Sequence, residues 1–372
     1  MQNEHGNIYV LIVAAGCSRR MKQFKPLLPL GKSCILESAV SSFQRAGLTN
    51  LAVVVGYRKQ ALLPVLRKYN ALVVENPAYD ETDMLESIKL GLNALPPETE
   101  AVFLCPTDVA LVSPHTIRAL MRTYQEGRTS AAALIPTYHG QTGHPPLFGK
   151  DVMNAILDYQ GDRGVRGVLE DFQDKVQYLE LPDPEIVEDA DLPKDYERMQ
   201  KALENQGIPD AQVCEDIWNY VKTPEHVRLH CRAVEKMALE LAEEYFQKNP
   251  EARQRVNKAV LSASALLHDM LKTVPGHAEA AAGLLEEMGY SKISPPVRFH
   301  RVLPANCRES VNEITLLYLA DRLIMETTPV SLEKRYAEKL RRYASDPRIQ
   351  NKIQADKETA QSLYKRIRGE NL

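Results

Sequence analysis

The stretch LIVAAGCSRRMKQFKPLLPLGKSCIL, residues 11–36, carries the features that decide the fold. It starts within a nearly all-apolar run, IYVLIVAA at 8–15, which stops at Gly16 as a buried parallel strand does. A polar loop rich in Gly, Ser and Arg follows, and Lys25 lies nine residues after Gly16. This pattern predicts a loop whose backbone N–H groups hold an anion, with Arg20 and Lys25 neutralising its charge. The alternative is a connector whose basic residues only face water.

Strand-like and helix-like stretches alternate over about the first 200 residues. Alternation of this kind implies βαβ units and an α/β domain with a Rossmann-like, mostly parallel sheet covered by helices on both faces. Ligands of such sheets bind outside the carboxyl ends of the strands, so the loops after Ala15, Asn76 and Cys105 are the expected site. Beyond 8–15, strands are predicted at 51–56, 71–76 and 101–105, and helices at 35–47, 59–69 and 87–95.

From about residue 206 the pattern changes to long amphipathic helices. Apolar side chains recur at helical intervals over 226–246, and strand-like runs largely disappear. The segment 204–212 is a plausible linker. The sequence therefore predicts an α/β domain at 1–205, an all-α domain at 206–345 and a basic helical tail at 346–372.

Composition narrows the class of protein. The 372 residues include 46 Lys and Arg against 49 Asp and Glu, and this near-neutral balance argues against a dedicated nucleic-acid binder. No apolar run approaches the roughly 20 residues of a membrane span, so no membrane partner is expected. We expect no secretion signal, because the first residues lack a basic segment and a small-residue cleavage site, and the six cysteines are scattered without a CxxC pair. A reduced, cytoplasmic protein of undetermined oligomeric state is expected.

The loop at 14–25 resembles the signature of molybdopterin nucleotidyltransferase-like enzymes, in which A-A-G-x-S-x-R-M follows a strand and a lysine comes later. The matching residues are Ala14, Ala15, Gly16, Ser18, Arg20, Met21 and Lys25. The likeness is closest to molybdenum cofactor cytidylyltransferases and continues over about 190 residues. Its further blocks are VVENPAY (73–79), FLCPTDVALVSP (103–114), GHPPLF (143–148), GDRGVR (161–166) and EDADLPKDYERM (188–199).

This resemblance implies a nucleotidyltransferase that moves a nucleoside monophosphate, CMP from CTP, to a phosphorylated acceptor such as molybdopterin. Asp108, together with Asp189 or Asp191, would hold Mg²⁺, a hard ion that prefers carboxylate oxygens. Arg20, Lys25 and Asp108 would carry catalysis by neutralising charge on the phosphates. The nucleotide would lie against Ala14, Ala15, Gly16, Ser18, Arg20, Lys25, Asn76 and Ser87.

Three positions depart from the family pattern. Lys22 stands where a glycine usually follows the methionine, and Asp83 and Leu85 replace a glycine and a small residue. An acidic Asp83 near an anionic substrate is unfavourable unless it faces away or binds metal. These departures leave open an alternative from another class, a nucleotide- or metabolite-sensing regulatory protein in which one domain binds without turnover.

The second half contains five of the nine histidines, between residues 226 and 300, together with His268-Asp269 and a later Asp321. Neutral imidazoles and carboxylates together are the ligand set of a hydrolytic divalent-metal site. The alternative is a purely structural role, in which each histidine only caps a helix or forms hydrogen bonds within a helical bundle.

Over roughly 215–345 the chain resembles the HD metal-dependent phosphohydrolase family. The resemblance implies a site for Mn, Fe, Ni, Co or Zn that hydrolyses a phosphate ester or nucleotide. Lys272 matches a catalytic lysine, and His277 and His300 match extra histidines of many members. His226 lies one turn before the motif and is expected not to be a ligand. The implied metal ligands are His230, His268, Asp269 and Asp321.

Overall fold

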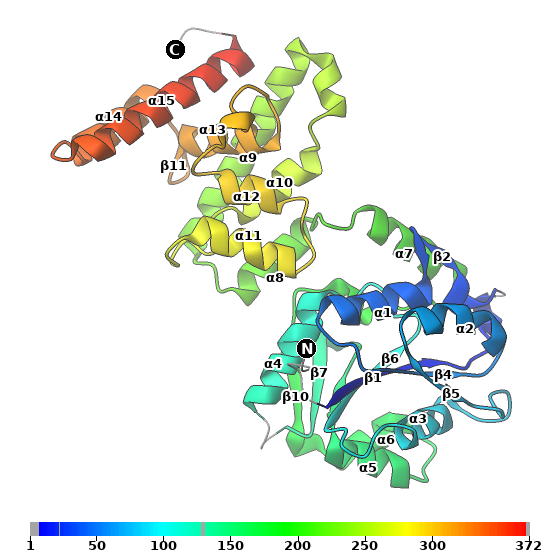
Figure 1. Cartoon of the computed structure of the whole chain (residues 1–372). Helices are drawn as coiled ribbons and strands as arrows, with labels where there is room; N and C mark the ends of the chain where they lie inside the picture. Colours follow the sequence, from blue (N-terminus) through cyan, green and yellow to red (C-terminus); the bar gives the residue numbers. More distant parts are fainter. Residues whose placement is uncertain (1–6, 22, 128–130, 370–372) are drawn as a thin grey trace. The chain divides into compact units, whose positions relative to one another are not determined.

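The structure is a computed structural model that describes residues 7–21, 23–127 and 131–369. Lys22 lies outside the described residues. The chain divides into two compact units, residues 1–205 and 206–372 (Figure 1). Among the described residues, no helix combines the length and the apolar character needed to cross a bilayer.

The first unit is built on an eight-stranded mixed sheet. Its strand order is β10-β7-β9-β6-β1-β4-β5, and β8 pairs with β7. β1 lies parallel to both β4 and β6, β5 is parallel to β4 and β10 to β7, whereas β9 is antiparallel to its neighbours. The expected mostly parallel sheet is therefore confirmed. The strands are β1 Ile8–Ala14, β4 Leu51–Val55, β5 Leu72–Glu75, β6 Ala101–Pro106, β7 Ala133–Tyr138, β8 Gln141–Thr142, β9 Leu147–Gly149 and β10 Val176–Glu180, with a separate hairpin of β2 Pro29–Leu30 and β3 Ser33–Cys34.

Side chains of the central strands alternate between two cores, one on each face of the sheet. Val10 and Ile12 of β1 belong to one core, and Leu11 belongs to the other. In Figure 1, α1 and α2 cover one face, whereas α3, α5 and α6 cover the other. Burial on both faces explains why these strands read as continuous apolar runs. The helices are α1 Ile35–Arg45, α2 Lys59–Lys68, α3 Met84–Asn93, α4 Pro114–Glu126, α5 Lys150–Asp158, α6 Gly164–Glu170 and α7 Pro193–Glu204.

Successive strands are added first on one side of β1 and then on its other side. β4 and β5 extend the sheet on one side of β1, while β6 begins the other side. The loops after β1 and β6 therefore diverge from adjacent strands and leave a crevice at their carboxyl ends, where open α/β sheets bind ligands.

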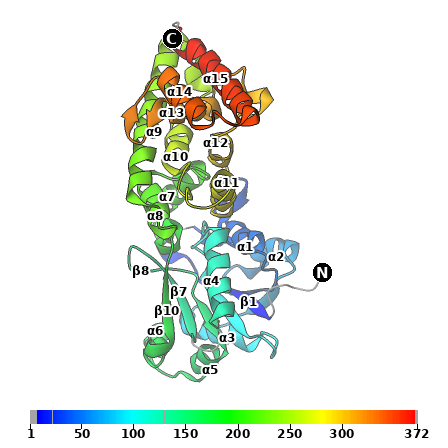
Figure 2. The same cartoon turned by 90° about the vertical axis from the view of Figure 1, so that its left-hand side faces the viewer.

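The second unit is helical apart from the small hairpin of β11 Ile324–Met325 and β12 Thr328–Pro329. The predicted helix over 226–246 is α9, which runs the length of this unit in Figure 2. α10 ends at Leu267, so His268 and Asp269 lie in the turn that follows it rather than inside a longer helix. The helices are α8 Ala211–Tyr220, α9 Glu225–Lys248, α10 Lys258–Leu267, α11 His277–Glu287, α12 Ser294–Phe299, α13 Glu313–Leu323, α14 Leu332–Arg342 and α15 Pro347–Arg368.

The expected tail at 346–372 is helical but packs into this unit instead of extending from it. α15 buries Ala360, Leu363 and Ile367 completely in the same core as α9 and α13. The abundant charges of this helix occupy its remaining faces, which is why the segment reads as a solvated tail.

Candidate active sites

A cavity of about 470 Å³ lies at the crevice of the first unit. The loops after β1 and β6 and the start of α3 form its walls, as the strand order requires. Of the residues expected to bind nucleotide, all but Asn76 line it. Its lining includes Ala14, Ala15, Gly16, Ser18, Arg20, Lys25, Ser87, Asp108 and Asp191.

Lys25 joins two carboxylates inside this cavity. Its Nζ lies 2.7 Å from Asp108 Oδ2 and 3.0 Å from Asp191 Oδ1. Burial would lower the pKa of Lys25, but the two carboxylates outweigh that effect and raise it, so the ammonium stays charged. Arg20 Nη1 adds a 2.7 Å ion pair to Asp191 Oδ2, although 72% of the Arg20 side chain is exposed. Residues far apart in the sequence thus form one charged cluster.

The two carboxylates of this cluster, Asp108 and Asp191, are also the candidate ligands of Mg²⁺. The carboxylates of Asp108 and Asp191 already hold a cation, the Lys25 ammonium, between them. Oxygen donors arranged around a positive charge fit a hard divalent ion. Of the two alternatives for the second carboxylate, Asp191 lines the cavity, whereas Asp189 is exposed and is not among the lining residues. Partial desolvation of its carboxylate, together with the negative charges of Asp191 and Asp108, raises the pKa of Asp189.

The loop after β1 leaves its backbone accessible. A Cβ placed on Gly16 would meet no atom within 4 Å, so the space in front of this backbone is open. Ser18 adopts a left-handed conformation at φ 52°, and its Oγ accepts a 3.2 Å hydrogen bond from the Lys25 N–H. Ser18 therefore braces the loop and sets the backbone position from which Lys25 reaches the carboxylates.

Asn76 supports the cavity from behind. Its Nδ2 donates to Ser87 Oγ at 2.9 Å and Thr82 Oγ1 at 3.0 Å, while its Oδ1 accepts from the Ala78 N–H at 3.0 Å. Asn76 is buried, and both polar atoms of its side chain are hydrogen-bonded. It thereby holds the segment after β5 against the start of α3. Ser87, which it contacts, is the member of this pair that faces the cavity.

Two departures from the family pattern have local explanations. Asp83 is the N-cap of α3, and its Oδ1 accepts a 3.0 Å hydrogen bond from the Glu86 N–H. Leu85 is 5% exposed and packs in the core beneath the sheet. Neither residue needs a bound metal to account for its presence.

A second cavity of about 530 Å³ adjoins the first. The two share Val13, Met84 and Pro106 in their walls, and most of the remaining lining is apolar. The blocks 143–148 and 161–166 contribute His144 and Arg166 to it. A molecule in this cavity would therefore lie beside the charged cluster.

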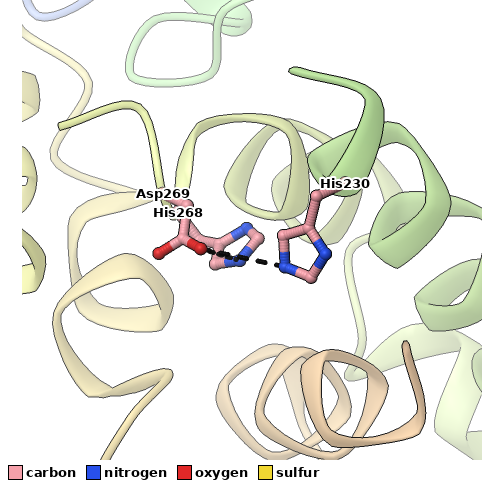
Figure 3. A group of neighbouring side chains, drawn as sticks. All are labelled: His230, His268 and Asp269. Atoms are coloured by element: carbon pink, nitrogen blue, oxygen red, sulfur yellow. Dashed lines mark ion pairs between the residues drawn. The ribbon is translucent and has the colours of Figure 1, made fainter. Parts of the chain in front are cut away.

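The helical unit gathers its ligand-type side chains from separate elements. His230 comes from α9, Asp321 from α13, and His268 and Asp269 from the turn after α10. Figure 3 shows His230 facing His268 and Asp269 across a short gap. His230 Nε2 lies 3.3 Å from Asp321 Oδ1 and 3.7 Å from Asp269 Oδ2. The structure thus brings together all four predicted ligands.

Backbone carbonyls orient three of the histidines. The Nδ1 atoms of His230, His268 and His300 lie 2.7, 2.8 and 2.6 Å from the carbonyl oxygens of Glu326, Ala265 and Val297, respectively. Since a carbonyl can only accept, each Nδ1 donates a proton, and when the ring is neutral each Nε2 keeps a lone pair. This is the tautomer that metal-ligating histidines adopt.

The ligand atoms form two groups that share Asp269. One group is His230, His268 and Asp269, and the other is Asp269, His277 and His300. His277 Nε2 lies 3.0 Å and His300 Nε2 3.5 Å from Asp269 Oδ1. The motif alone assigned neither of the latter two histidines to a metal. Only the fold reveals that they face the other oxygen of the same carboxylate.

Several atoms at this centre are buried without a hydrogen bond. Within the described part of the chain, His268 Nε2, His277 Nε2 and Asp269 Oδ1 make no hydrogen bond, because the 3.0 Å approach of His277 Nε2 to Asp269 Oδ1 lacks the geometry of one. Burial would raise the pKa of Asp269, but the facing histidines lower it far below its usual range, so the carboxylate is ionised. Buried, unsatisfied nitrogens around an ionised carboxylate fit a divalent transition metal.

Lys272 and His226 lie at the margin of this centre. Lys272 forms an ion pair with Asp269, and both residues line a cavity of about 1520 Å³ that opens from the ligand groups. His226 is exposed on the same cavity wall and belongs to neither ligand group.

Comparison with known proteins identifies the two units. Residues 10–177 match the MobA-like NTP transferase domain, and residues 227–326 match the HD domain. The chain therefore contains a nucleotidyltransferase domain of the MobA-like type followed by an HD domain. Both are enzyme domains, which confirms the expected class of protein.

Two curated proteins resemble the first unit in particular. The molybdenum cofactor cytidylyltransferase of Escherichia coli (strain K12) is 27% identical over 187 residues, which cover 50% of this chain and 92% of that protein. The 2-aminoethylphosphonate cytidylyltransferase of Lancefieldella rimae is 32% identical over 111 residues, or 28% of this chain and 44% of that protein. A solved nucleotidyl transferase from Methanothermobacter thermautotroptrophicus is 22% identical with a TM-score of 0.47, covering 53% of this chain and 98% of its own.

Proposed function

We propose that the first unit transfers CMP from CTP to a phosphorylated acceptor such as molybdopterin. The observation that carries the proposal is the contact of Lys25 with both Asp108 and Asp191 at the carboxyl ends of β1 and β6. The resemblance to two cytidylyltransferases supports CTP as the nucleotide. The adjoining apolar cavity offers room for the organic part of an acceptor.

In this reaction an oxygen of the acceptor phosphate attacks the α-phosphorus of CTP. The bond between that phosphorus and the bridging oxygen breaks, and pyrophosphate leaves. Arg20 and Lys25 would hold the triphosphate, and the open backbone at Gly16 would let its oxygens approach the N–H groups. Asp108 and Asp191 would hold Mg²⁺, which supplies charge neutralisation to the phosphates. The protein thus contributes mainly alignment and electrostatic stabilisation.

The test is a panel of the four NTPs with phosphorylated acceptors, followed by release of pyrophosphate. We expect release with CTP and molybdopterin in preference to the other nucleotides. Asp108→Asn should lose turnover by a larger factor than CTP affinity. Full turnover in Asp108→Asn would remove this residue from the site, and equal use of all four NTPs would contradict the preference for CTP.

We further propose that the helical unit hydrolyses a phosphate ester or nucleotide. His230, His268, Asp269 and Asp321 would hold one divalent ion, and Asp269, His277 and His300 would hold a second. A metal held there supplies a Lewis acid for the phosphate group. Lys272 lies beside Asp269 and would steady negative charge on the bound phosphate.

Metal analysis tests this second activity. The full chain should contain a transition metal and release phosphate from p-nitrophenyl phosphate or a nucleotide in its presence. The double variant His268→Ala/Asp269→Ala should lose both metal and phosphate release. Equal metal content and equal release in the two proteins would reject the hydrolase assignment.

A sensor without nucleotide turnover is the rival function. The presence of the Asp83 carboxylate in the wall of the nucleotide cavity favours it, because this charge repels phosphate. The NTP panel separates the two functions, since a sensor would bind nucleotide but release no pyrophosphate with any acceptor.

A further inference from the structure

The cavity that opens from the histidine cluster has a wall outside the matched HD domain. The match ends at residue 326, whereas α14 and α15 begin at Leu332 and Pro347. α14 and α15 lie side by side in Figures 1 and 2. Both contribute side chains to the lining of this 1520 Å³ cavity. The HD motif therefore describes the metal centre but not the surface on which the rest of a substrate would lie.

One face of α14 is basic where it lines this cavity. Arg335, Lys339 and Arg342 follow one another at spacings of four and three residues, which places them on the same side of a helix. Lys352 of α15 and Arg301 add positive charge to the lining. In all, eight Lys and Arg side chains line the cavity against four Asp and Glu. This excess of positive charge exists before any metal is bound.

Two of these cations, Lys339 and Arg335, have donor groups without a carboxylate or a hydrogen-bond acceptor in the part of the chain that the structure describes. Lys339 has no carboxylate within ion-pair distance among the described residues, and it lies over the Tyr336 ring at 5.3 Å. Burial, together with the charges of Arg322 and Arg335, lowers the pKa of Lys339. Arg335 Nε is buried and makes no hydrogen bond in the described structure, although Arg335 Nη2 lies 3.9 Å from Asp321 Oδ2. Arg335 and Lys339 both line the cavity, and each can donate hydrogen bonds to an anion there.

The size and the apolar part of the cavity limit what this anion can be. About 1520 Å³ exceeds the roughly 300–1,000 Å³ of most small-molecule sites, so inorganic phosphate or pyrophosphate alone would leave most of it unfilled. Leu229, Val302 and Ile349 also line it, and Val302 is 73% exposed. A substrate that covers these side chains needs an organic body in addition to its charged groups.

We infer that the substrate of the helical unit is an organic polyphosphate, a molecule with an organic body and at least two phosphoryl groups, whose phosphates beyond the cleaved one are held by Arg335 and Lys339. This inference rests on the proposed hydrolase function and adds its substrate class. Hydrolysis joins the oxygen of a water to one phosphorus, breaks one P–O bond and leaves the proton on the departing oxygen. Cleavage at the metal centre then leaves the remaining phosphates on α14.

The closing experiment compares Lys339→Gln with Arg341→Ala in the full chain. Lys339→Gln keeps most of the side chain over Tyr336, and Arg341 is an exposed residue of the same helix that does not line the cavity. With Mn²⁺ present, phosphate release is followed with CTP, CDP, CMP and p-nitrophenyl phosphate. In Lys339→Gln the KM for CTP and CDP should rise by about ten-fold or more, with little change for CMP and p-nitrophenyl phosphate. Arg341→Ala should match wild type, and Lys339→Arg should restore much of the loss.

A binding measurement keeps this inference separate from the hydrolase function. Calorimetry with methylenediphosphonate, in a Lys25→Ala background so that the first unit competes less, should give a dissociation constant raised by about ten-fold or more in Lys339→Gln. Equal affinities in the presence and absence of that substitution would overturn the inference. So would hydrolysis of CMP as efficiently as CTP, although the hydrolase function would then stand. Absence of hydrolysis with every substrate would instead reject the hydrolase function and the substrate class together.

Discussion

At the scale of single residues, Gly16 stands out because the space in front of its backbone is open. A Cβ there would contact nothing in the protein, so the usual argument from internal crowding does not apply. The backbone of Gly16 instead borders the space in which a triphosphate would lie. We therefore infer that glycine is needed here for the approach of a ligand and not for packing of the folded chain.

We expect Gly16→Ala to preserve folding and to weaken nucleotide binding. Its free energy of unfolding should stay within about 0.5 kcal/mol of wild type, because the added methyl group meets no atom. The KM for CTP should rise by about ten-fold or more, since close approach of phosphate to backbone N–H groups is blocked. Gly283→Ala is the matched control, because its Cβ also meets nothing but lies in α11 of the other unit. An unchanged KM in Gly16→Ala would contradict the phosphate assignment.

The residue scale also shows where sequence reasoning stops. Lys25 and Asp108 could be picked out because each follows a buried strand. The choice between Asp189 and Asp191 could not be made, because residues two apart in an extended segment point to the same side and are equivalent by spacing. Asn76 was expected to bind nucleotide, but its polar atoms are engaged by Ser87, Thr82 and Ala78. Such long-range or loop-specific bonds leave no periodic trace in a sequence.

At the scale of elements, α15 supports the histidine and aspartate cluster through one buried arginine. Arg322, adjacent to the predicted ligand Asp321, is 4% exposed, and its Nη2 lies 2.8 Å from Asp356 Oδ1 on α15. Tyr336 also donates a 2.7 Å hydrogen bond to Asp356 Oδ2. Arg322 further donates to the carbonyl oxygens of His300 and Arg301, which ties α13, α15 and the turn after α12 together.

Removing the carboxylate at the centre of this network should be costly. Asp356→Ala removes the closest counter-charge of the buried Arg322 guanidinium and leaves it only the Asp321 carboxylate at 3.9 Å, which should lower the free energy of unfolding by about 3–5 kcal/mol. Urea unfolding of the full chain, followed by the fluorescence of Trp218 in the helical unit, measures the effect. Glu358→Ala, an exposed change on the same helix, should shift stability by no more than about 0.5 kcal/mol. Similar shifts for both variants would show that the network contributes little.

The composition of α15 explains why residues 346–372 were predicted to be helical but not to pack against the rest of the unit. The basic residues of 346–372 outnumber the acidic ones, and the pattern was interpreted as a tail. The three fully buried side chains Ala360, Leu363 and Ile367 form too narrow a stripe to stand out among those charges. In the first unit, by contrast, β1, β4 and β6 are buried on both faces, and their unbroken apolar runs made the strands easy to predict.

At the scale of the whole molecule, the two units have separate cores. The two cores flanking the sheet contain only residues before 206, and the two helical cores contain only residues after it. The sequence predicted a change from alternating strands and helices to helices alone at this point, and a linker at 204–212. The structure adds that α8, which begins at Ala211 after its N-cap Asp210, belongs to the second unit.

Separate expression tests whether the two units act independently. Fragments 1–205 and 206–372 should each fold, because neither loses a core residue. The first should keep the CTP affinity of the full chain, and the second should keep its metal content. A cut at 212/213 would instead remove Asp210, whose side chain accepts from the Val213 N–H, and about 1 kcal/mol of helix capping with it. An insoluble fragment, or an activity that needs the covalent link, would favour a shared or regulated site.

The position of Lys25 between Asp108 and Asp191 has a consequence for the order in which ligands bind. A divalent cation must displace the ammonium to reach both carboxylates, and a triphosphate gives that ammonium another anionic partner. Each ligand would thereby remove an obstacle to the other, so we expect CTP and Mg²⁺ to bind with positive cooperativity. Thermodynamic reciprocity then requires CTP to strengthen Mg²⁺ binding by the same factor by which Mg²⁺ strengthens CTP binding. Without nucleotide, the Lys25 ammonium already neutralises both carboxylates, and we expect the affinity for free magnesium to be low.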